Sequence, residues 1–448
     1  MKRVFAVLLV AVLLAGVLSA NVLSYAYAAL QVVGDVNGDG RVNNRDLGNL
    51  QQVLNDWDVT ASAGADVNGD GSHNNRDMGD LQQILNGGER VPMFAPAAKY
   101  VELGAPAAAY YDTDYIARAA WDMAIYDGRL YVGCGNFGTN SGPTPVLSCP
   151  LDDVGNWSAE GTVPDEQVMR FVNLNGRFLI PGCDPVGRPQ KGYYYELDNG
   201  EWQTYADLPH GLHNFDLTWF HGRVYAAIGT DRGDYPVAYT EDGVRYETLP
   251  FYKDGVPRPT DQSDVIRSCN LYVLGDTLYA DFWYESEDSS RTVFEMYRYN
   301  EAEDRFDYVA DLKDAIHGGQ YGVAGLPLWG KAALGEWMFL TTGYLYYTTD
   351  FIEYTELELP NGTAVYDMVM GEDGRLYLLA SYVKDDGYQI TVYSIGESNP
   401  TALRTETAFF YSQMPTAFAV ADDCFFIGTG DWYGIGAEDN GMILQVER

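Results

Sequence analysis

Two near-copies of one loop constrain the N-terminal part of the chain more than any other feature. The first runs from Asp35 to Asp46 and the second from Asp66 to Asp77. In each copy, oxygen-bearing side chains occupy loop positions 1, 3, 5, 9 and 12, and glycine occupies position 6. Ca²⁺ takes about six to eight oxygen ligands. A glycine permits the sharp turn that directs such ligands inward. The loops therefore predict two bound Ca²⁺ ions.

The predicted ligands include the backbone carbonyl of loop position 7. In the first loop they are Asp35, Asn37, Asp39, Arg41, Asn43 and Asp46. In the second loop they are Asp66, Asn68, Asp70, Ser72, Asn74 and Asp77.

An amphipathic helix is predicted to follow each loop. Apolar residues recur there at helical spacing, namely Leu47, Leu50, Val53 and Leu54, and then Met78, Leu81, Ile84 and Leu85. This loop and exiting helix, duplicated at a spacing of 31 residues, resembles a type I dockerin over about Gly34 to Glu89. The resemblance implies a small α domain at 30–90 that binds a cohesin domain of a cellulosome scaffoldin. A regulatory or buffering EF-hand pair is the alternative.

The resemblance also implies which residues contact the cohesin. They are loop positions 10 and 11 and a pair on the following helix, which here are Asn44, Arg45, Gln51 and Gln52, and Asn75, Arg76, Gln82 and Gln83. Because the two quartets are identical, either copy could present the same surface, and binding in two orientations related by a half-turn is a hypothesis. The alternative is that these polar side chains are merely solvated.

The first 28 residues have the pattern of a secretory signal peptide. Lys2 and Arg3 precede an apolar run at 4–18, and Ala26 and Ala28 provide the small residues of a cleavage site. An uncleaved membrane anchor is the alternative, although the run is shorter than a full membrane span. We therefore expect an extracellular, secreted protein.

The charge of the chain excludes two classes of partner. The formal net charge is −36, from 64 acidic and 28 basic residues. Such a surface repels nucleic acids and anionic membranes, so we expect neither as a partner. The five cysteines are scattered and lack zinc-ligand spacing, so we interpret them as small buried apolar residues, and the sequence leaves their disulfide state open.

After a linker at 91–97, the region 98–448 repeats one pattern seven times. An apolar segment, a tight polar turn and a second apolar segment recur at 126–131, 174–179, 220–225, 274–279, 334–339, 372–377 and 421–426. A period near fifty built from short strands and hairpins is typical of a propeller blade. We predict an all-β, seven-bladed propeller, with six or eight blades as alternatives. A strand at 99–103 is expected to complete the last blade and to close the ring.

Two outer turns support this fold. The segment Thr240 to Tyr246 resembles a worn Asp-box of sialidase-like propellers, and Tyr347 to Tyr354 is a weaker match that lacks the glycine. Asp-boxes lie on the outer rim, so the resemblance indicates a fold and not a reaction.

Polar residues just upstream of the repeated segments are the candidate site. At the entrance of a propeller funnel they form a concave ligand site by default. The candidate catalytic residues are Asp122, Asp216, Asp264, Asp367 and Tyr366. The candidate substrate-binding residues are Arg118, Trp121, Arg170, His210, His213, Arg267 and His317. The alternative for each is a structural role in joining neighbouring blades.

The sequence leaves three kinds of activity open. A glycosidase needs two carboxylates on either side of the scissile bond, and a lyase could use His210 or His213 as its base. A sialidase-like site would combine Arg118, Arg170 and Arg267 with Tyr366 as nucleophile and Asp122 as acid/base. The dockerin resemblance implies a role in polysaccharide breakdown, as a hydrolase or lyase. A non-catalytic glycan- or protein-binding propeller and a peptidase-related accessory are the rival interpretations.

Overall fold

The structure is a computed structural model of the 448-residue chain. It describes residues 34–37, 42–55, 57, 59–67, 73–86, 99–186, 192–205, 208, 211–230, 235–243, 245–258, 266–285, 292–312, 330–357, 359, 363–384, 387–397, 399–431 and 440–448. The chain forms two compact units, Met1–Pro96 and Ala97–Arg448. The predicted signal peptide and the linker at 91–97 lie outside the described residues. Among the helices described, none has the length and apolar character needed to cross a membrane.

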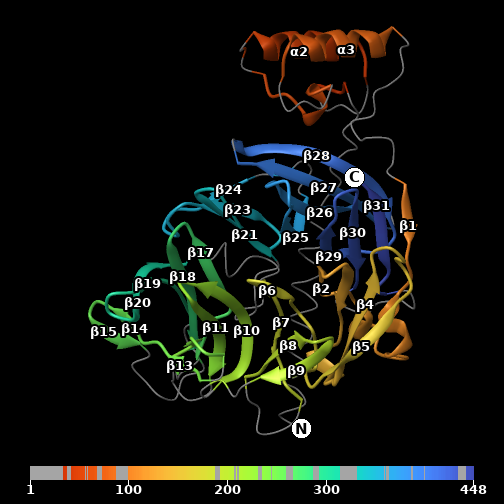
Figure 1. The fold of residues 1–448 in the computed structure, drawn as a ribbon. Helices are drawn as coiled ribbons and strands as arrows, with labels where there is room; N and C mark the ends of the chain where they lie inside the picture. The colour runs from red at the N-terminus through yellow and green to blue at the C-terminus, as the bar shows by residue number, and fades with distance from the viewer. Residues whose placement is uncertain are drawn as a thin grey trace, which may run out of the picture. The chain divides into compact units, whose positions relative to one another are not determined.

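The small unit contains the two predicted helices, α2 (Asn44–Leu54) and α3 (Asn75–Leu85), with a 3-10 turn η1 (Ala63–Ala65) between them. Asn43 caps α2: its side chain accepts the N–H of Arg45, while its own N–H donates to Asp46. Leu50 of α2 and Leu81 of α3 are completely buried. The helices therefore pack through the apolar positions that their periodicity indicates (Figure 1).

The large unit is an all-β, propeller-like domain in which sheets are arranged around a centre (Figure 1). The first two four-stranded sheets are β2 (Asp122–Tyr126), β3 (Arg129–Gly133), β4 (Thr144–Pro150) and β5 (Ser158–Val163), and β6 (Val172–Leu174), β7 (Arg177–Pro181), β8 (Tyr194–Asp198) and β9 (Glu201–Tyr205). Three short 3-10 turns precede or join these strands, η2 (Pro106–Ala109), η3 (Ile116–Arg118) and η4 (Phe137–Thr139).

Three further four-stranded sheets follow later in the chain. Two of them are β21 (Gly330–Leu334), β22 (Trp337–Thr341), β23 (Leu345–Thr348) and β24 (Thr355–Glu356), and β25 (Ala364–Met370), β26 (Leu376–Lys384), β27 (Gly387–Gly396) and β28 (Asn399–Tyr411). The last sheet contains β29 (Pro415–Val420), β30 (Cys424–Thr429), β31 (Ile443–Glu447) and β1 (Tyr100–Glu102).

An eleven-stranded sheet lies between the second and third of these sheets in the chain order. Its strands are β10 (Gly211–Phe220), β11 (Arg223–Thr230), β12 (Val237–Thr240), β13 (Glu247–Thr248), β14 (Phe251–Lys253), β15 (Val256–Arg258), β16 (Ile266–Arg267), β17 (Leu271–Leu274), β18 (Thr277–Glu285), β19 (Thr292–Asn300) and β20 (Arg305–Asp311).

The prediction of seven separate blades is wrong, since the described structure has five separate four-stranded blades. The strands expected as the third and fourth blades belong to the single eleven-stranded sheet. The short strand β16 is the reason, because Arg267 pairs with Gly229 of β11 on one side and with Trp283 of β18 on the other. The segment between the repeats at 220–225 and 274–279 is long enough to supply this extra strand.

The first and last sheets close the ring. Tyr100 and Glu102 of β1 pair with Val446 and Leu444 of β31, so the strand expected at 99–103 lies in the last sheet. Leu130 and Leu147 of the first sheet share one apolar core with residues of the last sheet. The second strand of most sheets is buried along nearly its whole length, because neighbouring sheets cover both of its faces.

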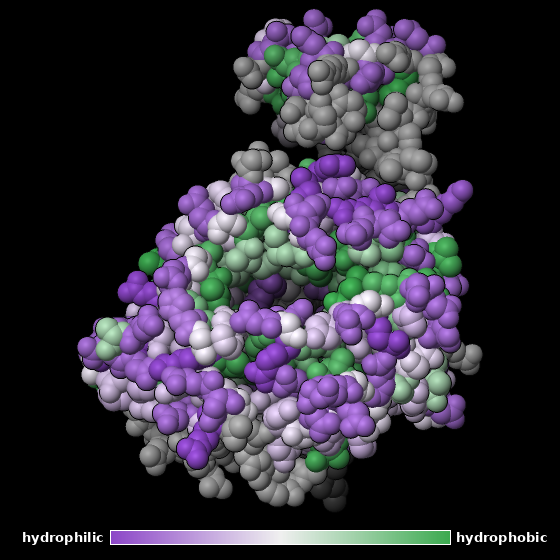
Figure 2. All heavy atoms as spheres, in the orientation of Figure 1, coloured by the Kyte–Doolittle hydropathy of each residue, from purple (hydrophilic) through white to green (hydrophobic). Residues whose placement is uncertain are grey.

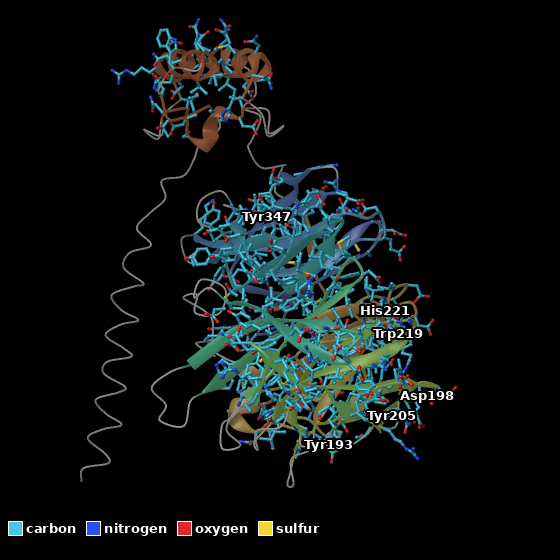
Figure 3. All side chains as sticks on the ribbon, turned by 90° about the vertical axis from the view of Figure 1, so that its left-hand side faces the viewer. Tyr193, Asp198, Tyr205, Trp219, His221 and Tyr347 are labelled. Carbon is cyan, nitrogen blue, oxygen red and sulfur yellow. The ribbon has the colours of Figure 1, made fainter. Side chains whose placement is uncertain are left out.

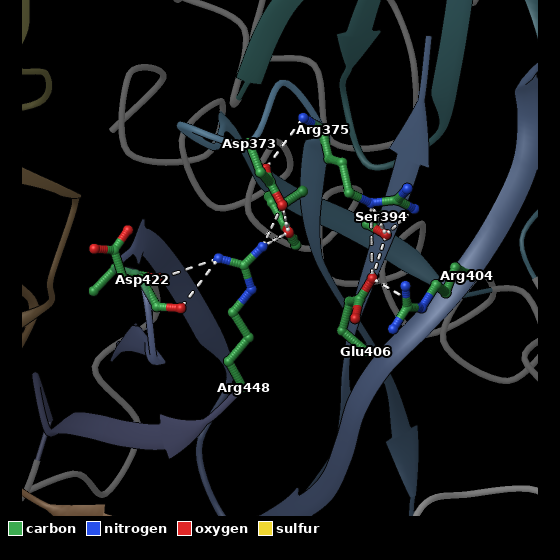
Figure 4. Close-up of polar contacts among 9 residues, drawn as sticks. Asp373, Arg375, Ser394, Arg404, Glu406, Asp422 and Arg448 are labelled. Carbon is green, nitrogen blue, oxygen red and sulfur yellow. Dashed lines mark hydrogen bonds and ion pairs between the residues drawn. The ribbon is translucent and has the colours of Figure 1, made fainter. Parts of the chain in front are cut away.

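The C-terminal residue adds polar contacts between two sheets (Figure 4). The Arg448 guanidinium forms an ion pair with Asp373 and lies 4.8 Å from the centre of the Tyr377 ring. In the same sheet, Arg375 Nε donates to Ser394 Oγ at 3.0 Å, and Arg404 Nε lies 3.4 Å from Glu406 Oε1. The contacts of Arg448 hold the end of the last sheet against its neighbour, whereas the other two lie within the β25–β28 sheet.

The predicted tight turns have the backbone that two-residue hairpins need. Asp127 and Gly128 have φ values of 46° and 73°, and Asn175 and Gly176 have values of 52° and 82°. In the outer turns, the N–H of Arg245 donates to Asp242 Oδ1 (2.8 Å) and that of Ile352 donates to Asp350 Oδ1 (2.8 Å). The Asp-box resemblance of these two turns stays a prediction.

Phe251 offers a test of the packing in the eleven-stranded sheet. Its fully buried ring stacks on Phe306 with a centroid distance of 4.7 Å and meets Tyr297 edge-on at 4.8 Å. We expect Phe251→Ala to lower the free energy of unfolding by about 3–5 kcal/mol, because it leaves a cavity. Urea unfolding followed by near-ultraviolet circular dichroism measures this. Val383→Ala, at a residue 72 % exposed, is the control, and an equal effect of both changes would contradict the packing.

Candidate functional site

A cavity of about 1060 Å³ lies at the centre of the sheets, and the domain is hollowed there in Figure 2. The inner strand of each four-stranded sheet lines it, and the eleven-stranded sheet contributes two strands. The lining strands are β2, β6, β10, β17, β21, β25 and β29. Every sheet thus contributes to the cavity wall, which is the arrangement expected for a ligand site in a propeller.

Six of the residues predicted from the sequence line this cavity together. They are Trp121, Asp122, Arg170, Asp216, Tyr366 and Asp367. These residues come from segments separated by more than two hundred positions, so only the closed ring brings them together.

An ion-pair cluster lies on one side of the cavity. Arg170 Nη1 donates to Asp216 Oδ1 at 2.9 Å, and Lys331 Nζ contacts Asp216 Oδ2. Burial alone would raise the pKa of Asp216, but Lys331 and Arg170 hold it below its ordinary value. Burial lowers the pKa of Lys331 despite the opposing effect of Asp216. Asp216 is therefore ionised at neutral pH, with both oxygens engaged by cations.

Three cavity aspartates also join neighbouring inner strands. Asp122 Oδ2 accepts the N–H of Phe171 at 2.5 Å, Asp216 Oδ2 accepts that of Leu271 at 2.8 Å, and Asp367 Oδ2 accepts that of Phe418 at 2.9 Å. Irregular strand pairing precedes Asp216 in β10 and Asp367 in β25. Such bulges redirect a side chain, and here the carboxylates are directed at the next inner strand.

Asp122 and Asp367 form an electrostatically interacting carboxyl pair. Burial raises the pKa of Asp122 to about 7, although the N–H of Phe171 and the charge of Arg170 act in the opposite direction. Burial and then the Asp122 charge raise the pKa of Asp367 well above its ordinary value. Because the two groups disfavour each other's ionisation, the pair holds at least one proton near neutral pH.

Three predicted site residues do not line the cavity in the described part of the chain. Buried Arg118 donates from Nε to the Tyr111 carbonyl at 2.6 Å, and Arg267 lies 5.2 Å from the Trp283 ring centre. His213 Nδ1 lies 2.5 Å from the Cys183 carbonyl oxygen, and burial lowers the pKa of His213. The three arginines of the sialidase-like hypothesis therefore have different surroundings, and only Arg170 faces the cavity.

Asp264, His210 and His317 lie outside the described residues. Another tryptophan, Trp219, is 39 % exposed and lies near His221 at the hairpin between β10 and β11, and it does not line the cavity (Figure 3). All five cysteines are described, and each is a buried free thiol, which confirms their interpretation as buried residues.

The lining residues that sequence reasoning missed include Lys331, Gln167 and Phe137. Lys331 lies within the inner strand itself, whereas the candidates near it were sought further upstream, at His317. Phe137 lies in a loop between β3 and β4, for which the repeat pattern carries no signal.

In the small unit, the last acidic residue of each predicted Ca²⁺ loop is fully buried. Asp46 accepts the N–H groups of Asn37 (3.2 Å) and Asn43 (2.8 Å), and Asp77 accepts those of Val67 (2.8 Å) and Asn74 (2.8 Å). Each carboxylate therefore connects the beginning of its loop to the helix that follows it.

The described loop residues fit a hard cation. Asp35 and Asp46 are buried and supply oxygen atoms, which Ca²⁺ prefers to nitrogen or sulfur. Asp39, Arg41, Asn68, Asp70 and Ser72 lie outside the described residues, and no cluster of three His, Cys, Asp or Glu side chains suited to a metal occurs in the part that is described. The site would be completed by the ligands predicted from the sequence.

Six of the predicted cohesin-contact residues have side chains that the structure describes, and all six are at least partly exposed to solvent. Asn44, Arg45 and Gln51 are exposed and Gln52 is half-buried, while Asn75 and Gln82 are exposed. The side chains of Arg76 and Gln83 lie outside the described set.

Comparison with known families identifies the small unit. Residues 33–86 match the family model for the dockerin type I domain. No curated protein matches the chain. The chain therefore has a dockerin N-terminal region followed by an all-β, propeller-like domain.

Several solved structures resemble the chain. One is an α-L-arabinanase of Penicillium chrysogenum complexed with arabinobiose, with 13 % identity, 78 % of this chain and 98 % of that chain covered, and a TM-score of 0.39. Another is a PL25 ulvan lyase, with 10 % identity, 72 % and 91 % coverage and a TM-score of 0.43. The β-propeller domain of the Trilobed protease from Pyrococcus furiosus has 10 % identity, 74 % and 95 % coverage and a TM-score of 0.42. These low values do not distinguish one activity from another.

The raised pKa of Asp122 predicts a pH dependence of stability. Between about pH 4 and 7 the folded protein keeps a proton that an unfolded aspartate releases, so this group makes stability fall as the pH rises. We expect Asp122→Asn to reduce this decrease, in urea unfolding measured from pH 4 to 8. Asp198→Asn, at an exposed residue, is the control. A pH profile of Asp122→Asn that matches the control would contradict the prediction.

Proposed function

We propose that this protein is a secreted component of a cellulosome-type assembly that docks through its dockerin and acts on polysaccharide at the central cavity of its β domain. The observation that carries the proposal is the dockerin match at residues 33–86, joined in one chain to a domain with a charged central cavity. Dockerins attach enzymes and other modules to cohesin domains. Docking would therefore bring the central cavity of this protein close to a polysaccharide substrate.

Docking uses the two Ca²⁺ loops and the quartets that follow them. Two Ca²⁺ ions hold the loops, and the exposed residues of either quartet contact a cohesin domain. Support comes from the buried position of Asp46 and Asp77 and from the exposure of Asn44, Arg45 and Gln51. Because both copies carry the same quartet, the proposal includes two orientations of binding.

Removal of Ca²⁺ tests the docking part of the proposal. We expect a chelator, or Asp35→Ala combined with Asp66→Ala, to weaken binding to a type I cohesin by on the order of a hundredfold, because the loops then lose their central ion. Calorimetry with and without added Ca²⁺ measures this. Asp80→Ala, outside both loops, is the control for a simple loss of charge. Unchanged cohesin binding in the chelator would contradict the proposal.

Hydrolysis is the reaction that the cavity supports best. A glycosidase needs one carboxyl group that keeps its proton near neutral pH and a second carboxylate nearby. Asp122 and Asp367 line the same cavity and interact electrostatically, and each has a raised pKa. We assign Asp367, whose pKa is raised well above its ordinary value, as the acid and Asp122 as its partner carboxylate, with Tyr366 beside them. Asp216 serves to hold Arg170 and Lys331, since both of its oxygens are engaged.

Non-catalytic binding is the second candidate, and one observation favours it. Asp122 and Asp367 each accept two backbone N–H groups, from Phe171 and Met123, and from Phe418 and Met368. In this candidate function, the only role of the two carboxylates is to join neighbouring strands through these hydrogen bonds. The cavity would then bind a saccharide without cleaving it.

Product analysis separates these candidates. We expect the full-length protein to release oligosaccharides from one or more plant polysaccharides, and Asp122→Asn or Asp367→Asn to reduce the rate by on the order of a hundredfold or more, because the acid/base pair is lost. Mass spectrometry detects the products and distinguishes hydrolysis from the unsaturated ends that a lyase leaves. Asp198→Asn is the control. Retention on a polysaccharide without any product would favour the binding module.

A further inference from the structure

Phe137 occupies an unusual position at the cavity. It lies in η4, in the connection from β3 to β4, and it lines the cavity although its residue surface is 41 % exposed. The other described aromatic residues of the lining are buried or half-buried, such as Phe178 at 1 % and Phe171 at 9 %. An exposed aromatic ring at the opening of a cavity is a surface suited to a ligand.

The loop that carries Phe137 is held by its own hydrogen bonds. The N–H of Asn136 donates to Ser141 Oγ at 2.7 Å and to the Glu166 carbonyl at 2.9 Å. Asn136 Oδ1 accepts the N–H of Gly138 at 2.9 Å, and its Nδ2 donates to Asp114 at 3.2 Å. The exposed ring is therefore held in place by a well-bonded turn.

Gln167 lies directly beneath this loop. The residue is 1 % exposed, lines the cavity and accepts the N–H of Phe137 with Oε1 at 3.3 Å. This bond fixes the orientation of the amide. Its Nε2 has no hydrogen-bond partner among the described residues. A buried donor without an acceptor is unfavourable, so a ligand oxygen at this point would satisfy it.

Trp121 belongs to the same group of residues. Its indole Nε1 donates to the carbonyl of Gly135 at 2.7 Å, which leaves the ring as apolar lining of the cavity. Gly135 also forms an isolated β-bridge with Gln167. Trp121, Phe137 and Gln167 are thus connected to one another through the short segment from Gly135 to Phe137.

We propose that Phe137, Trp121 and Gln167 form a saccharide subsite at the opening of the cavity. A sugar ring has an apolar C–H face, which packs against the aromatic rings, and hydroxyl groups, one of which accepts the Gln167 Nε2–H. The inference deepens the proposed function and rests on it, since it names the ligand class at the same cavity. Asp114 and Glu166 contact this loop and carry carboxyl groups, so a neutral sugar fits better than an anionic one.

Affinity electrophoresis of the full-length protein tests the subsite. The gels contain arabinan, xylan, mixed-linkage β-glucan or galactomannan as neutral polysaccharides, and polygalacturonate as the anionic probe. We expect retention on at least one neutral polysaccharide and a tenfold or greater loss of affinity in Phe137→Ala. Phe137→Trp should restore the affinity. Phe410→Ala is the matched control, because Phe410 is 39 % exposed on β28 and does not line the cavity.

A second variant separates ligand binding from loop structure. Gln167→Glu keeps an oxygen that accepts the Phe137 N–H, and its ionised carboxylate lacks the Nε2 donor, so we expect weaker retention. Because a carboxylate at a residue that is 1 % exposed destabilises the fold, we also expect a lower thermal unfolding temperature, and retention is measured well below it. If the wild-type protein is retained and neither Phe137→Ala nor Gln167→Glu weakens its retention, the subsite is overturned. The proposed function is then unaffected. Retention on polygalacturonate alone would overturn the neutral ligand class. Absence of both retention and products on every polysaccharide would overturn the proposed function and the subsite together.

Discussion

The side chains of three aspartates connect the inner strands around the central cavity. Backbone ladders run within each sheet, and an inner strand has no neighbouring ladder on its cavity side. Asp122, Asp216 and Asp367 meet this need by accepting the N–H groups of Phe171, Leu271 and Phe418 from the following inner strands. Since buried backbone groups must be paired, these bonds help to fix the ring that defines the cavity.

The same constraint sets the electrostatic character of the cavity. Joining the strands places carboxyl groups in a confined space, where burial raises the pKa of Asp122 and Asp367. Asp216 escapes this effect because Arg170 and Lys331 neutralise it. The three aspartates therefore share one structural role but differ in protonation. Asp216 is ionised, whereas Asp122 and Asp367 retain their protons to higher pH. This difference arises from the neighbouring cations and not from the aspartates themselves.

The small unit uses buried carboxylates in a related way. Asp46 and Asp77 each accept two backbone N–H groups and so connect the beginning of a loop to its exit helix. The two copies share these bonds because they share their sequence, and the helices pack through Leu50 and Leu81. In both units, acidic side chains thus organise the backbone, which gives the strongly acidic composition a structural role beyond surface charge.

The sequence alone determined the features that depend on local pattern. The loop duplication specified the dockerin region, the helical spacing specified α2 and α3, and the recurring hairpins specified an all-β domain. Six of the predicted site residues do line one cavity, because each was read from the start of an inner strand and those starts meet at the centre.

Tertiary structure decided the rest. A spacing of hairpins cannot show that the two-residue strand β16 joins two expected blades into one sheet, since so short a strand has no pattern of its own. Nor can it show that Arg118 binds the carbonyl of Tyr111 while Lys331 enters the cavity. Local periodicity is set by neighbours along the chain, whereas the partner of each charge is set by segments far apart that only the closed ring brings into contact.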